Sequence, residues 1–508
     1  MKVYNTLSGQ KEEFLPHGDE VKMYVCGVTP YSDCHIGHAM SYIIFDVIRR
    51  YLQFRGYKVK YVQNITDIDD KIIDRANQLG ISTSELAGKF TVRYFEDMDA
   101  LNVTRADVYP KATEEIPKII EVIQGLVDKG YAYSASGSVY FRVRSVPDYG
   151  KLSHRNLESM MAAEGALGSD DKESPMDFVL WKAAKPGEPS WESPWGPGRP
   201  GWHIECSVMS LKYLGNTLDI HGGGQDLVFP HHENEIAQSE SFTGIKPFVK
   251  YWLHNGLVQL GEEKMSKSLG NLITIEEAVR KYSADAIRIF VLHSHYRSPL
   301  TYSEEALEAA KGGVKRLLQA VKRIDPTRGV GESLDAEAYR KQFITAMDND
   351  FNTPQALAIL SDLATATIKA ADSGLSFLKA QNVLLELGRN VLGLELKFKH
   401  ITIEAPTAGG KAEALAPTLV IGHVPPAEIE DTVNNLVSTR QSLRNARQWP
   451  LADKIRAKLG ELGITIEDGC SGPSAINYGS NLNTESKTLL VEFSDEIEAK
   501  IAELGIDF

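Results

Sequence analysis

The segment 21–64 contains a strand, a helix and a second strand in succession, and this order constrains the fold more than any other feature of the chain. Residues 21–27 form a mostly apolar run that ends at a glycine, which is typical of a buried strand. Residues 38–54 carry apolar side chains at helical spacing, and residues 58–64 predict the second strand. Two parallel strands joined in this way have a right-handed crossover. We therefore expect an α/β fold with a doubly wound parallel sheet that binds its ligand at the carboxyl edge.

Composition indicates a folded protein and leaves its partners open. The 508 residues allow about three domains at roughly 100–200 residues each. The formal net charge of -13 argues against a nucleic-acid partner, but net charge says little about one face of one domain. We expect no membrane span, because no stretch approaches the roughly 20 apolar residues that a span needs. Residues 1–10 lack the apolar core of a signal peptide, so we expect a cytoplasmic protein.

The cysteines are few and widely spaced. They are Cys26, Cys34, Cys206 and Cys470. Such a set does not form a disulfide framework, so we expect free or metal-bound thiols in the reducing cytosol. Of the four, we expect Cys34 to be a small buried residue and Cys470 to lie outside any site.

A histidine-rich segment stands where the loop after the first strand meets the start of the helix. Residues 34–38 have the sequence CHIGH. Backbone N–H groups at a helix start attract an anion such as phosphate, and Gly37 allows a ligand to approach the backbone closely. His35 and His38 can donate hydrogen bonds to phosphate oxygens as charge develops in a transition state. Two ordinary surface histidines are the alternative explanation of this motif taken alone.

A lysine-rich segment far along the chain is the second candidate element. Residues 264–268 have the sequence KMSKS, and such a loop can fold over a triphosphate and supply positive charge. Taken alone, it is equally explained as a solvated lysine loop. Together, the two segments resemble the two signatures of the class I aminoacyl-tRNA synthetases. The resemblance implies that His35, His38, Lys264 and Lys267 are catalytic, and that ATP binds to these four residues, Gly37 and Ser266.

A dispersed set of residues offers the ligands of a metal site. Cys26, Cys206, His231 and Glu235 supply two thiolates, one imidazole and one carboxylate. His231 and Glu235 are at positions i and i+4, so on a helix they face the same way. The spacing of the two cysteines is weak evidence by itself, because free cysteines are commonly buried. The neighbouring His232 points about 100° away on a helix, and we expect it to pack or to contact substrate.

The surroundings of this set resemble the signatures of the cysteinyl-tRNA synthetases. The similar stretches are residues 26–31, 64–71 (NITDIDDK), 201–206 (GWHIEC) and 221–235. The resemblance implies one Zn²⁺ per chain, held by Cys26, Cys206, His231 and Glu235. The zinc would take the thiolate of L-cysteine as a further ligand and reject the neutral hydroxyl of serine. It also implies Mg²⁺ with ATP, and an amino-acid pocket lined by Gly27, Thr66 and Trp202.

The resemblance further implies a Rossmann-like catalytic domain with an insertion, followed by an α-helical anticodon-binding domain. Residues 283–288 (SADAIR) resemble a segment beside that helical domain in several class I synthetases. Residues 136–200 show no regular pattern, and we expect irregular structure there. We expect the first half of the catalytic domain at 1–115, the insertion at 116–200, the second half with the zinc site at 201–260, the KMSKS loop and a linking subdomain at 261–302, the helical domain at 303–396, and a C-terminal helical region with an acidic tail at 397–508.

Basic residues near the C-terminus are the candidate contacts with tRNA. Arg440, Arg444 and Arg447 would form one stripe on a helix, although a solvated helix face would have the same pattern. The family usually ends soon after a segment like 462–468. This chain continues, and residues 484–508 form a candidate acidic helix whose charge would repel phosphate or partner a basic surface.

Three functions are compatible with these features. The leading hypothesis is the activity of the resembled family, with ATP, L-cysteine and tRNA-Cys as partners and a monomeric chain. The alternative enzyme is the related ligase that joins cysteine to an amino sugar in mycothiol synthesis, which resembles a truncated synthetase. The third hypothesis is a synthetase-like RNA-binding or regulatory protein, which should have lost signature residues that are present here.

Overall fold

The computed structural model divides the chain into two compact units, Met1–His400 and Ile401–Phe508. The described residues are 1–164, 171–260, 263–264, 273–323, 325, 333–397, 433, 436, 439, 449–461, 464–467 and 475–478. In this part of the chain, no helix combines the length and the apolar character needed to cross a membrane.

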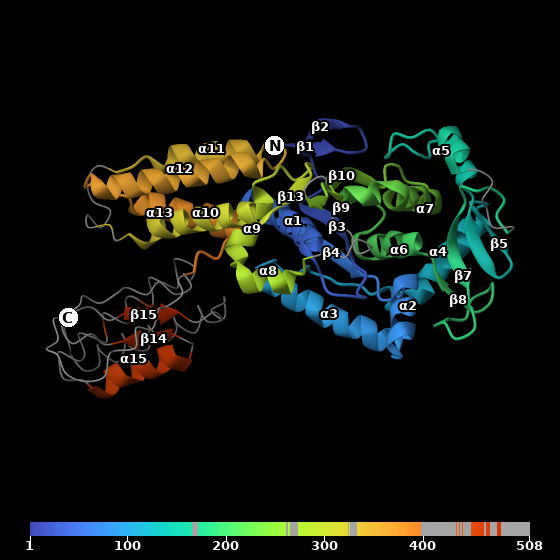
Figure 1. Cartoon of the computed structure of the whole chain (residues 1–508), viewed down its shortest axis with the longest axis horizontal. Helices are drawn as coiled ribbons and strands as arrows, with labels where there is room; N and C mark the ends of the chain where they lie inside the picture. The colour runs from blue at the N-terminus through green and yellow to red at the C-terminus, as the bar shows by residue number, and fades with distance from the viewer. Residues whose placement is uncertain are drawn as a thin grey trace. The chain divides into compact units, whose positions relative to one another are not determined.

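A four-stranded parallel sheet forms the centre of the first unit (Figure 1). Its strands are β3 (Glu20–Val28), β4 (Lys58–Ile65), β9 (Leu218–Gly224) and β10 (Val249–Asn255), in the order β10-β9-β3-β4. Helix α1 (Ile36–Phe54) connects β3 to β4, as the sequence predicts. All the pairings are parallel, so the carboxyl ends of the strands meet at one edge. The predicted α/β fold is confirmed.

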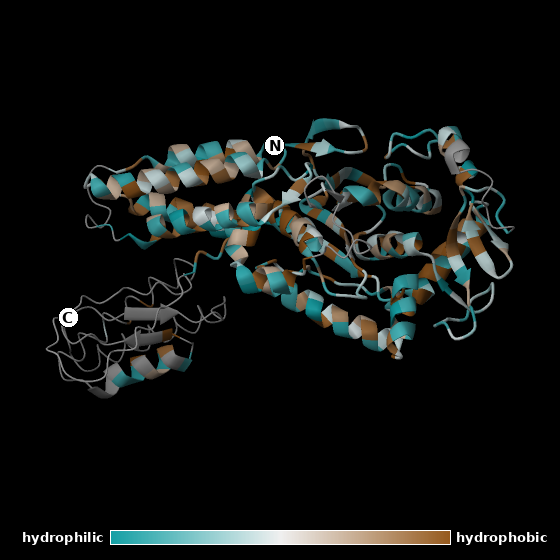
Figure 2. Cartoon of the chain, in the orientation of Figure 1, coloured by the Kyte–Doolittle hydropathy of each residue, from teal (hydrophilic) through white to brown (hydrophobic). Residues whose placement is uncertain are grey.

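Alternate residues of β3 face opposite layers of the unit. Met23 and Val25 belong to the core that includes α1, whereas Cys26 belongs to a second core with Cys206 of helix α6 (Trp202–Leu214). Successive side chains of a strand point to opposite faces, so Cys26 faces α6. Figure 2 shows hydrophobic residues concentrated in the central strands and on the helices that cover them. The packing of β3 therefore carries one candidate metal ligand toward the helix that carries another.

An antiparallel sheet occupies the insertion. Its strands are β5 (Ala132–Ala135), β6 (Ser138–Phe141), β7 (Phe178–Ala183) and β8 (Gly198–Pro200), in that order. The prediction of irregular structure over 136–200 is therefore wrong. The strands are short, and β8 contains glycine and proline, which are depleted in strands but tolerated at a sheet edge. The sheet shares a core with α4 (Ile116–Asp128) and with Ile204 of α6, so it supports the helix that carries Cys206.

Smaller elements complete the first unit. One antiparallel pair and one three-stranded sheet lie outside the central sheet, the latter in the order β12-β11-β13. The strands are β1 (Lys2–Asn5), β2 (Gln10–Glu13), β11 (Val258–Leu260), β12 (Glu263–Lys264) and β13 (Leu300–Tyr302). The helices are α2 (Asp70–Leu79), α3 (Thr83–Ala100), η1 (Ala112–Glu114), η2 (Val143–Ser145), α5 (Leu157–Glu164), η3 (Gln225–Leu227), η4 (Val228–His232), α7 (Glu233–Thr243) and α8 (Ile275–Lys281).

Helices follow the central sheet. They are α9 (Ala284–Leu292), α10 (Glu304–Lys322), α11 (Ala336–Met347), α12 (Thr353–Asp372), α13 (Leu378–Leu385) and η6 (Glu386–Val391). Helices α10, α11, α12 and α13 pack side by side as a bundle (Figure 1).

Arg288 of the SADAIR segment ties this bundle to the sheet layer. Its fully buried guanidinium donates to the Asp46 carboxylate of α1 at 2.6 Å, to the Leu392 carbonyl at 2.9 Å and to the Leu101 carbonyl at 3.1 Å. Asp285 accepts hydrogen bonds from the backbone N–H groups at 395 and 396. The segment thus has a structural role that is visible in its contacts: a paired buried charge joins the two parts of the unit.

The second unit contains helix α15 (Trp449–Glu461) and an antiparallel pair, β14 (Ile464–Glu467) with β15 (Ala475–Tyr478). The C-terminal region predicted to be helical at 397–508 therefore also contains a short strand pair. The alternation in residues 464–467 is too short to be distinguished from a helix end by pattern alone. The acidic tail at 484–508 lies outside the described residues.

Candidate active site and metal centre

Two cysteines from different elements meet at the carboxyl edge of the central sheet. Cys26 lies near the end of β3, and Cys206 lies in the first half of α6. Both are buried, and their Sγ atoms are 3.9 Å apart. The two cysteines are 180 residues apart in sequence, and the packing of one face of β3 against α6 brings them together.

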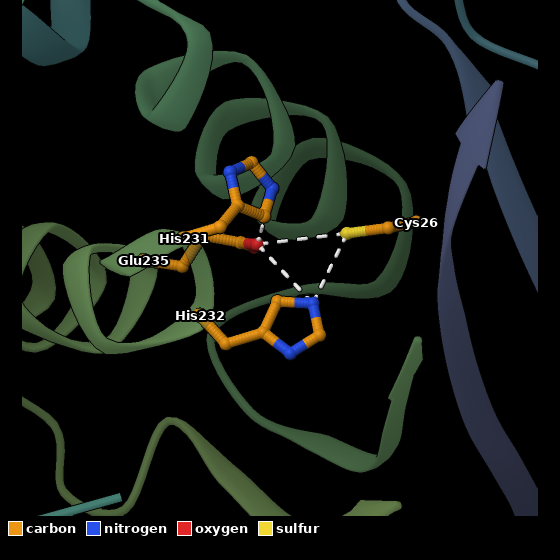
Figure 3. A group of neighbouring side chains, drawn as sticks. All are labelled: Cys26, His231, His232 and Glu235. Atoms are coloured by element: carbon orange, nitrogen blue, oxygen red, sulfur yellow. Dashed lines mark hydrogen bonds and ion pairs between the residues drawn. The ribbon is translucent and has the colours of Figure 1, made fainter. Parts of the chain in front are cut away.

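Three further candidate ligands come from one short stretch around the start of α7. His231 Nε2 is 3.0 Å from Glu235 Oε1, and a side-chain hydrogen bond also joins His231 to Cys206. His232 Nε2 is 3.2 Å from Cys26 Sγ. Ligand atoms of Cys26, His231, His232 and Glu235 all lie within 4.8 Å of one another (Figure 3).

The position of His232 corrects the prediction that it points away from the other ligands. His231 and His232 lie at i−4 and i−3 from Glu235, and both spacings place side chains on the same helix surface. Both lie in the π-helical turn η4, whose backbone is extended at Phe229. The structure therefore brings five candidate ligands together, the four predicted ones and His232.

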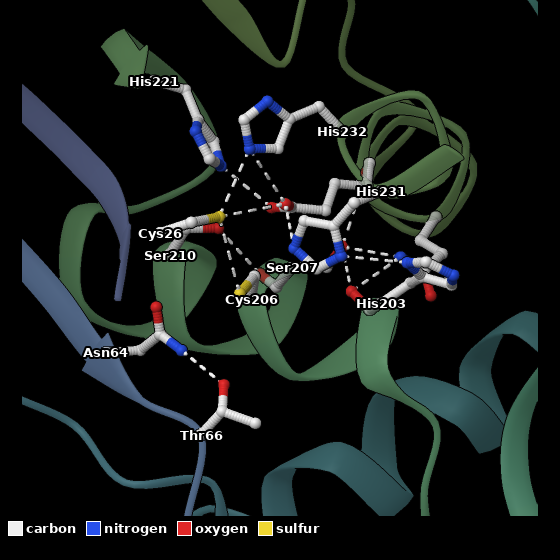
Figure 4. A network of polar contacts seen from close by, with 12 residues as sticks. Cys26, Asn64, Thr66, His203, Cys206, Ser207, Ser210, His221, His231 and His232 are labelled. Atoms are coloured by element: carbon white, nitrogen blue, oxygen red, sulfur yellow. Dashed lines mark hydrogen bonds and ion pairs between the residues drawn. The ribbon is translucent and has the colours of Figure 1, made fainter. Parts of the chain in front are cut away.

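A second layer of histidines surrounds these residues: His221 and His254 are buried and His203 is half-buried, and Figure 4 shows His203 and His221. His221 Nε2 is 2.9 Å from Glu235 Oε2, and His203 Nδ1 is 2.9 Å from His231 Nδ1. His254 Nε2 is 2.7 Å from His232 Nδ1. Sequence reasoning missed all three supporting roles. The available signal was that His203 and His221 lie inside the motifs that carry the resemblance, whereas His254 lies in β10 with no local signal.

The electrostatics of the site follow from burial and these contacts. Burial raises the pKa of Glu235, but His221 and His231 outweigh it and lower that pKa to about 2. A hydrogen bond from Cys26 and another from His231 lower the pKa of the Cys206 thiol to about 6, against the effect of burial. Burial instead raises the pKa of Cys26. Burial also lowers the pKa of His203 and of His254 to about 3, so these two imidazoles stay neutral.

This donor set fits a zinc ion. Thiolate sulfur, imidazole nitrogen and carboxylate oxygen are the ligands that Zn²⁺ takes in proteins, usually four at a time. Outer imidazoles and carboxylates that fix the ligand orientation are likewise usual around such ions. The five candidates give two sets of four ligands. Both sets contain Cys26, His231 and Glu235, and the fourth ligand is either Cys206 or His232.

The predicted amino-acid pocket adjoins the cysteine pair. The pairing of β3 with β4 is irregular between Val25 and Val28, and within this break the Gly27 N–H donates to Asn64 Oδ1 at 2.8 Å. Asn64 Nδ2 then donates to Thr66 Oγ1 at 3.0 Å. Such breaks re-aim side chains next to active sites. The ring of Trp202, 40% exposed, stacks on His231 with centroids 4.2 Å apart.

The two signature histidines are held in one tautomer by the helix start. His35 caps α1: the Gly37 N–H donates to His35 Nδ1 at 3.1 Å, and the His35 N–H donates to His38 Nδ1 at 3.2 Å. An imidazole whose Nδ1 accepts must, when neutral, carry its proton on Nε2. Both rings therefore present Nε2–H as a donor, which is the group that a phosphate oxygen accepts from.

Backbone hydrogen bonds bring the chain after the KMSKS segment to the CHIGH loop. The Ile36 N–H donates to the Ile273 carbonyl at 3.0 Å, and the Ile275 N–H donates to the Cys34 carbonyl at 2.9 Å. Lys264 lies on β12, opposite Gln259 of β11. Ser266 and Lys267 lie outside the described residues, as do Arg440, Arg444 and Arg447.

Comparison with known proteins agrees with this geometry. Residues 14–312 match the family model of the tRNA synthetases class I (C) catalytic domain, and residues 342–397 match the DALR domain. A cysteine–tRNA ligase of Dehalococcoides mccartyi is 58% identical, over 93% of this chain and 98% of the relative. The chain belongs to the cysteine–tRNA ligase family. A second member, from Thermococcus onnurineus, is 49% identical over 93% of this chain and 98% of its own length.

The family assignment also bears on the fold and on the alternative hypotheses. A methionyl-tRNA synthetase of Mycobacterium tuberculosis in complex with methionyl-adenylate has the same fold, with a TM-score of 0.58 at 17% identity over 74% of this chain and 92% of its own. The reported cysteine–tRNA ligases match nearly the whole chain, so the mycothiol-ligase alternative is not supported.

Gly27 should be irreplaceable at the edge of the pocket. A Cβ at this position would lie 1.6 Å from the Asn64 carbonyl oxygen, so the backbone must move. We expect Gly27→Ala to lower the free energy of unfolding by about 1–3 kcal/mol and to weaken cysteine binding. Chemical denaturation and calorimetry measure the two effects.

Gly18→Ala is the matched control, because a Cβ there meets nothing within 4 Å. It should change stability by less than about 0.5 kcal/mol. Equal behaviour of the two variants would contradict the close approach of Gly27 and Asn64.

Proposed function

We propose that this chain joins L-cysteine to the 3′ end of tRNA-Cys in two steps. ATP and cysteine first give cysteinyl adenylate and pyrophosphate, and the amino acid then passes to a ribose hydroxyl. The identity of 58% over 93% of the chain to a cysteine–tRNA ligase carries this proposal. The buried thiol, imidazole and carboxylate cluster supports it, because it suits the recognition of a thiol.

Cysteine is selected at the metal centre. Cys26, Cys206, His231 and Glu235 would hold one Zn²⁺, which when bound supplies a soft Lewis acid that prefers a thiolate to a neutral hydroxyl. A packing pocket alone separates near-isosteric substrates by only about 10–200-fold. His203 and His221 hold His231 and Glu235 in place through their hydrogen bonds. Gly27, Thr66 and Trp202 line the pocket beside them.

The activation step depends on positioning and charge. The substrate carboxylate is already ionised, so it attacks the α-phosphorus of ATP without a side-chain base, and pyrophosphate leaves. The Nε2–H groups of His35 and His38 donate to phosphate oxygens, while Gly37 leaves room for close approach. Lys264, Ser266 and Lys267 complete the contacts with ATP and its Mg²⁺.

The nucleic acid binds to the helical parts of the chain. The match of residues 342–397 to the DALR domain supports a contact with tRNA there. Arg440, Arg444 and Arg447 are further candidate contacts. We expect the enzyme to act in the cytoplasm as a monomer.

The purified chain should exchange pyrophosphate into ATP when cysteine is present, and should then transfer labelled cysteine to tRNA-Cys. Serine at the same concentration should support neither reaction, because its hydroxyl does not compete with a thiolate for the metal. Isotope exchange and filter-bound radioactivity measure the two steps. Absence of exchange, or exchange without transfer to tRNA, would contradict the proposal.

Replacement of Cys206 tests the ligand set. Cys206→Ser should lose bound zinc and raise the KM for cysteine, because a hydroxyl is a poor zinc ligand. Metal content is measured by mass spectrometry, and KM by pyrophosphate exchange.

His232→Ala is the matched variant, since His232 Nε2 lies 3.2 Å from Cys26 Sγ, against 3.9 Å for Cys206 Sγ. It should keep one zinc per chain if Cys206 is the fourth ligand. Loss of zinc from His232→Ala, with zinc retained in Cys206→Ser, would replace Cys206 by His232 in the set.

A further inference from the structure

A buried carboxylate beside the metal centre has one oxygen that is not satisfied by the protein. Glu205 precedes Cys206 in the first turn of α6 and is 1% exposed. In the part of the chain that the structure describes, its Oε2 atom has no hydrogen-bond partner. Leaving a buried carboxyl oxygen unpaired is costly, so such a group in a substrate pocket points to a ligand that pairs with it.

An oriented chain of hydrogen bonds leads to this carboxylate. The Gly27 N–H donates to Asn64 Oδ1, so the amide of Asn64 must present its Nδ2 to Thr66. Thr66 Oγ1 accepts that bond and donates its own proton to Glu205. Backbone and side chains thus fix the position of Glu205, while Oε2 remains for something else.

Glu205 is also one of the residues that line a cavity next to the candidate metal ligands. The cavity has a volume of about 370 Å³, and its wall includes Glu205, Trp202 and His203. Trp202 stacks on His231, and His203 is hydrogen-bonded to the same ring. The cavity therefore adjoins Glu205 and, through Trp202 and His203, the ring of His231.

Other acids of the cavity wall are already engaged by the protein. Asp70 pairs with Lys182 and Arg199, and Asp69 caps helix α2 by accepting from the Lys71 N–H. Glu205 is thus the acid of this wall that has an unsatisfied oxygen.

We propose that Glu205 binds the α-ammonium group of the substrate amino acid through Oε2. The inference rests on the proposed function, because it assumes that the substrate thiol lies at the cluster around Cys206. In cysteine, the sulfur and the nitrogen are separated by Cβ and Cα alone, so a thiol held there places its ammonium group within a short distance of the residue adjacent to Cys206. The ammonium then supplies the three N–H donors that a buried carboxylate needs nearby. Glu205 would select amino acids over thiols without an amine, as the metal centre selects thiols over hydroxyls.

The test compares two ligands that differ in this group. 3-Mercaptopropionate has the thiol and the carboxylate of cysteine but lacks the amine. Calorimetric binding to the full chain with its metal should show cysteine at least about tenfold tighter than 3-mercaptopropionate in the wild type. Glu205→Gln keeps the shape of the side chain and an acceptor for Thr66. It should weaken the binding of cysteine by about 10–100-fold and that of 3-mercaptopropionate by less than about threefold.

Glu115→Gln is the matched control. Glu115 is also a buried carboxylate, but its oxygens accept from Lys212 and Tyr213. Its replacement should change neither affinity. Metal content, measured for each variant, separates loss of the ammonium contact from loss of the centre.

Equal weakening of both ligands in Glu205→Gln, or of neither, would overturn the inference. If Glu205→Gln does not fold, the same two affinities are measured for Glu205→Asp and for the wild type. Equal affinity of the wild type for cysteine and 3-mercaptopropionate would also overturn the inference. Failure of the proposed function gives a different result. In that case the wild type shows no cysteine-dependent pyrophosphate exchange, although it still binds cysteine more tightly than 3-mercaptopropionate and this preference still depends on Glu205.

Discussion

The packing of strand β3 between two helical layers is the constraint on which the rest of the structure depends. One face of the strand lies in the core with α1, and the other lies in the core with α6. The first contact places the CHIGH loop at the start of α1, and the second brings Cys26 to Cys206. A shift of β3 by one residue would exchange its two faces and separate both sites at once. Phosphate chemistry and thiol recognition are therefore fixed by the same strand.

The metal centre illustrates how a folded chain tolerates so many ionisable groups in one core. Charge is confined to an inner set, in which the pKa of Glu235 is lowered to about 2 and that of Cys206 to about 6. The outer histidines, His203 and His254, are kept neutral by burial. Neutral imidazoles supply hydrogen bonds without adding charge, and they orient the inner ligands.

Sequence patterns predicted the central strands and helix well, because residues 21–64 carry strong apolar periodicity. The cluster of Cys26, Cys206, His231 and Glu235 was found through motif resemblance, since spacing alone could not join cysteines so far apart. The predicted orientation of His232 was wrong because residues three and four positions before Glu235 both share its helix surface. His254 carries no local signal, because its role exists only once β10 lies beside β9. The antiparallel sheet of the insertion was missed because its strands are short and the last of them, β8, contains glycine and proline.

The net charge of -13 is a poor guide to the partners of this chain. The family contains enzymes that handle tRNA, and its assignment rests on local residues rather than on overall composition. Local chemistry at the sheet edge, where two thiols, a carboxylate and several imidazoles meet, is far more informative.

The central claim is that substrate cysteine binds through its sulfur at the metal centre. X-ray absorption at the zinc edge, measured on the full chain with and without cysteine, tests this most directly. We predict that cysteine adds one zinc–sulfur contact at about 2.3 Å to those of the free enzyme, and that serine adds none. An unchanged number of sulfur neighbours in the presence of saturating cysteine would contradict the account.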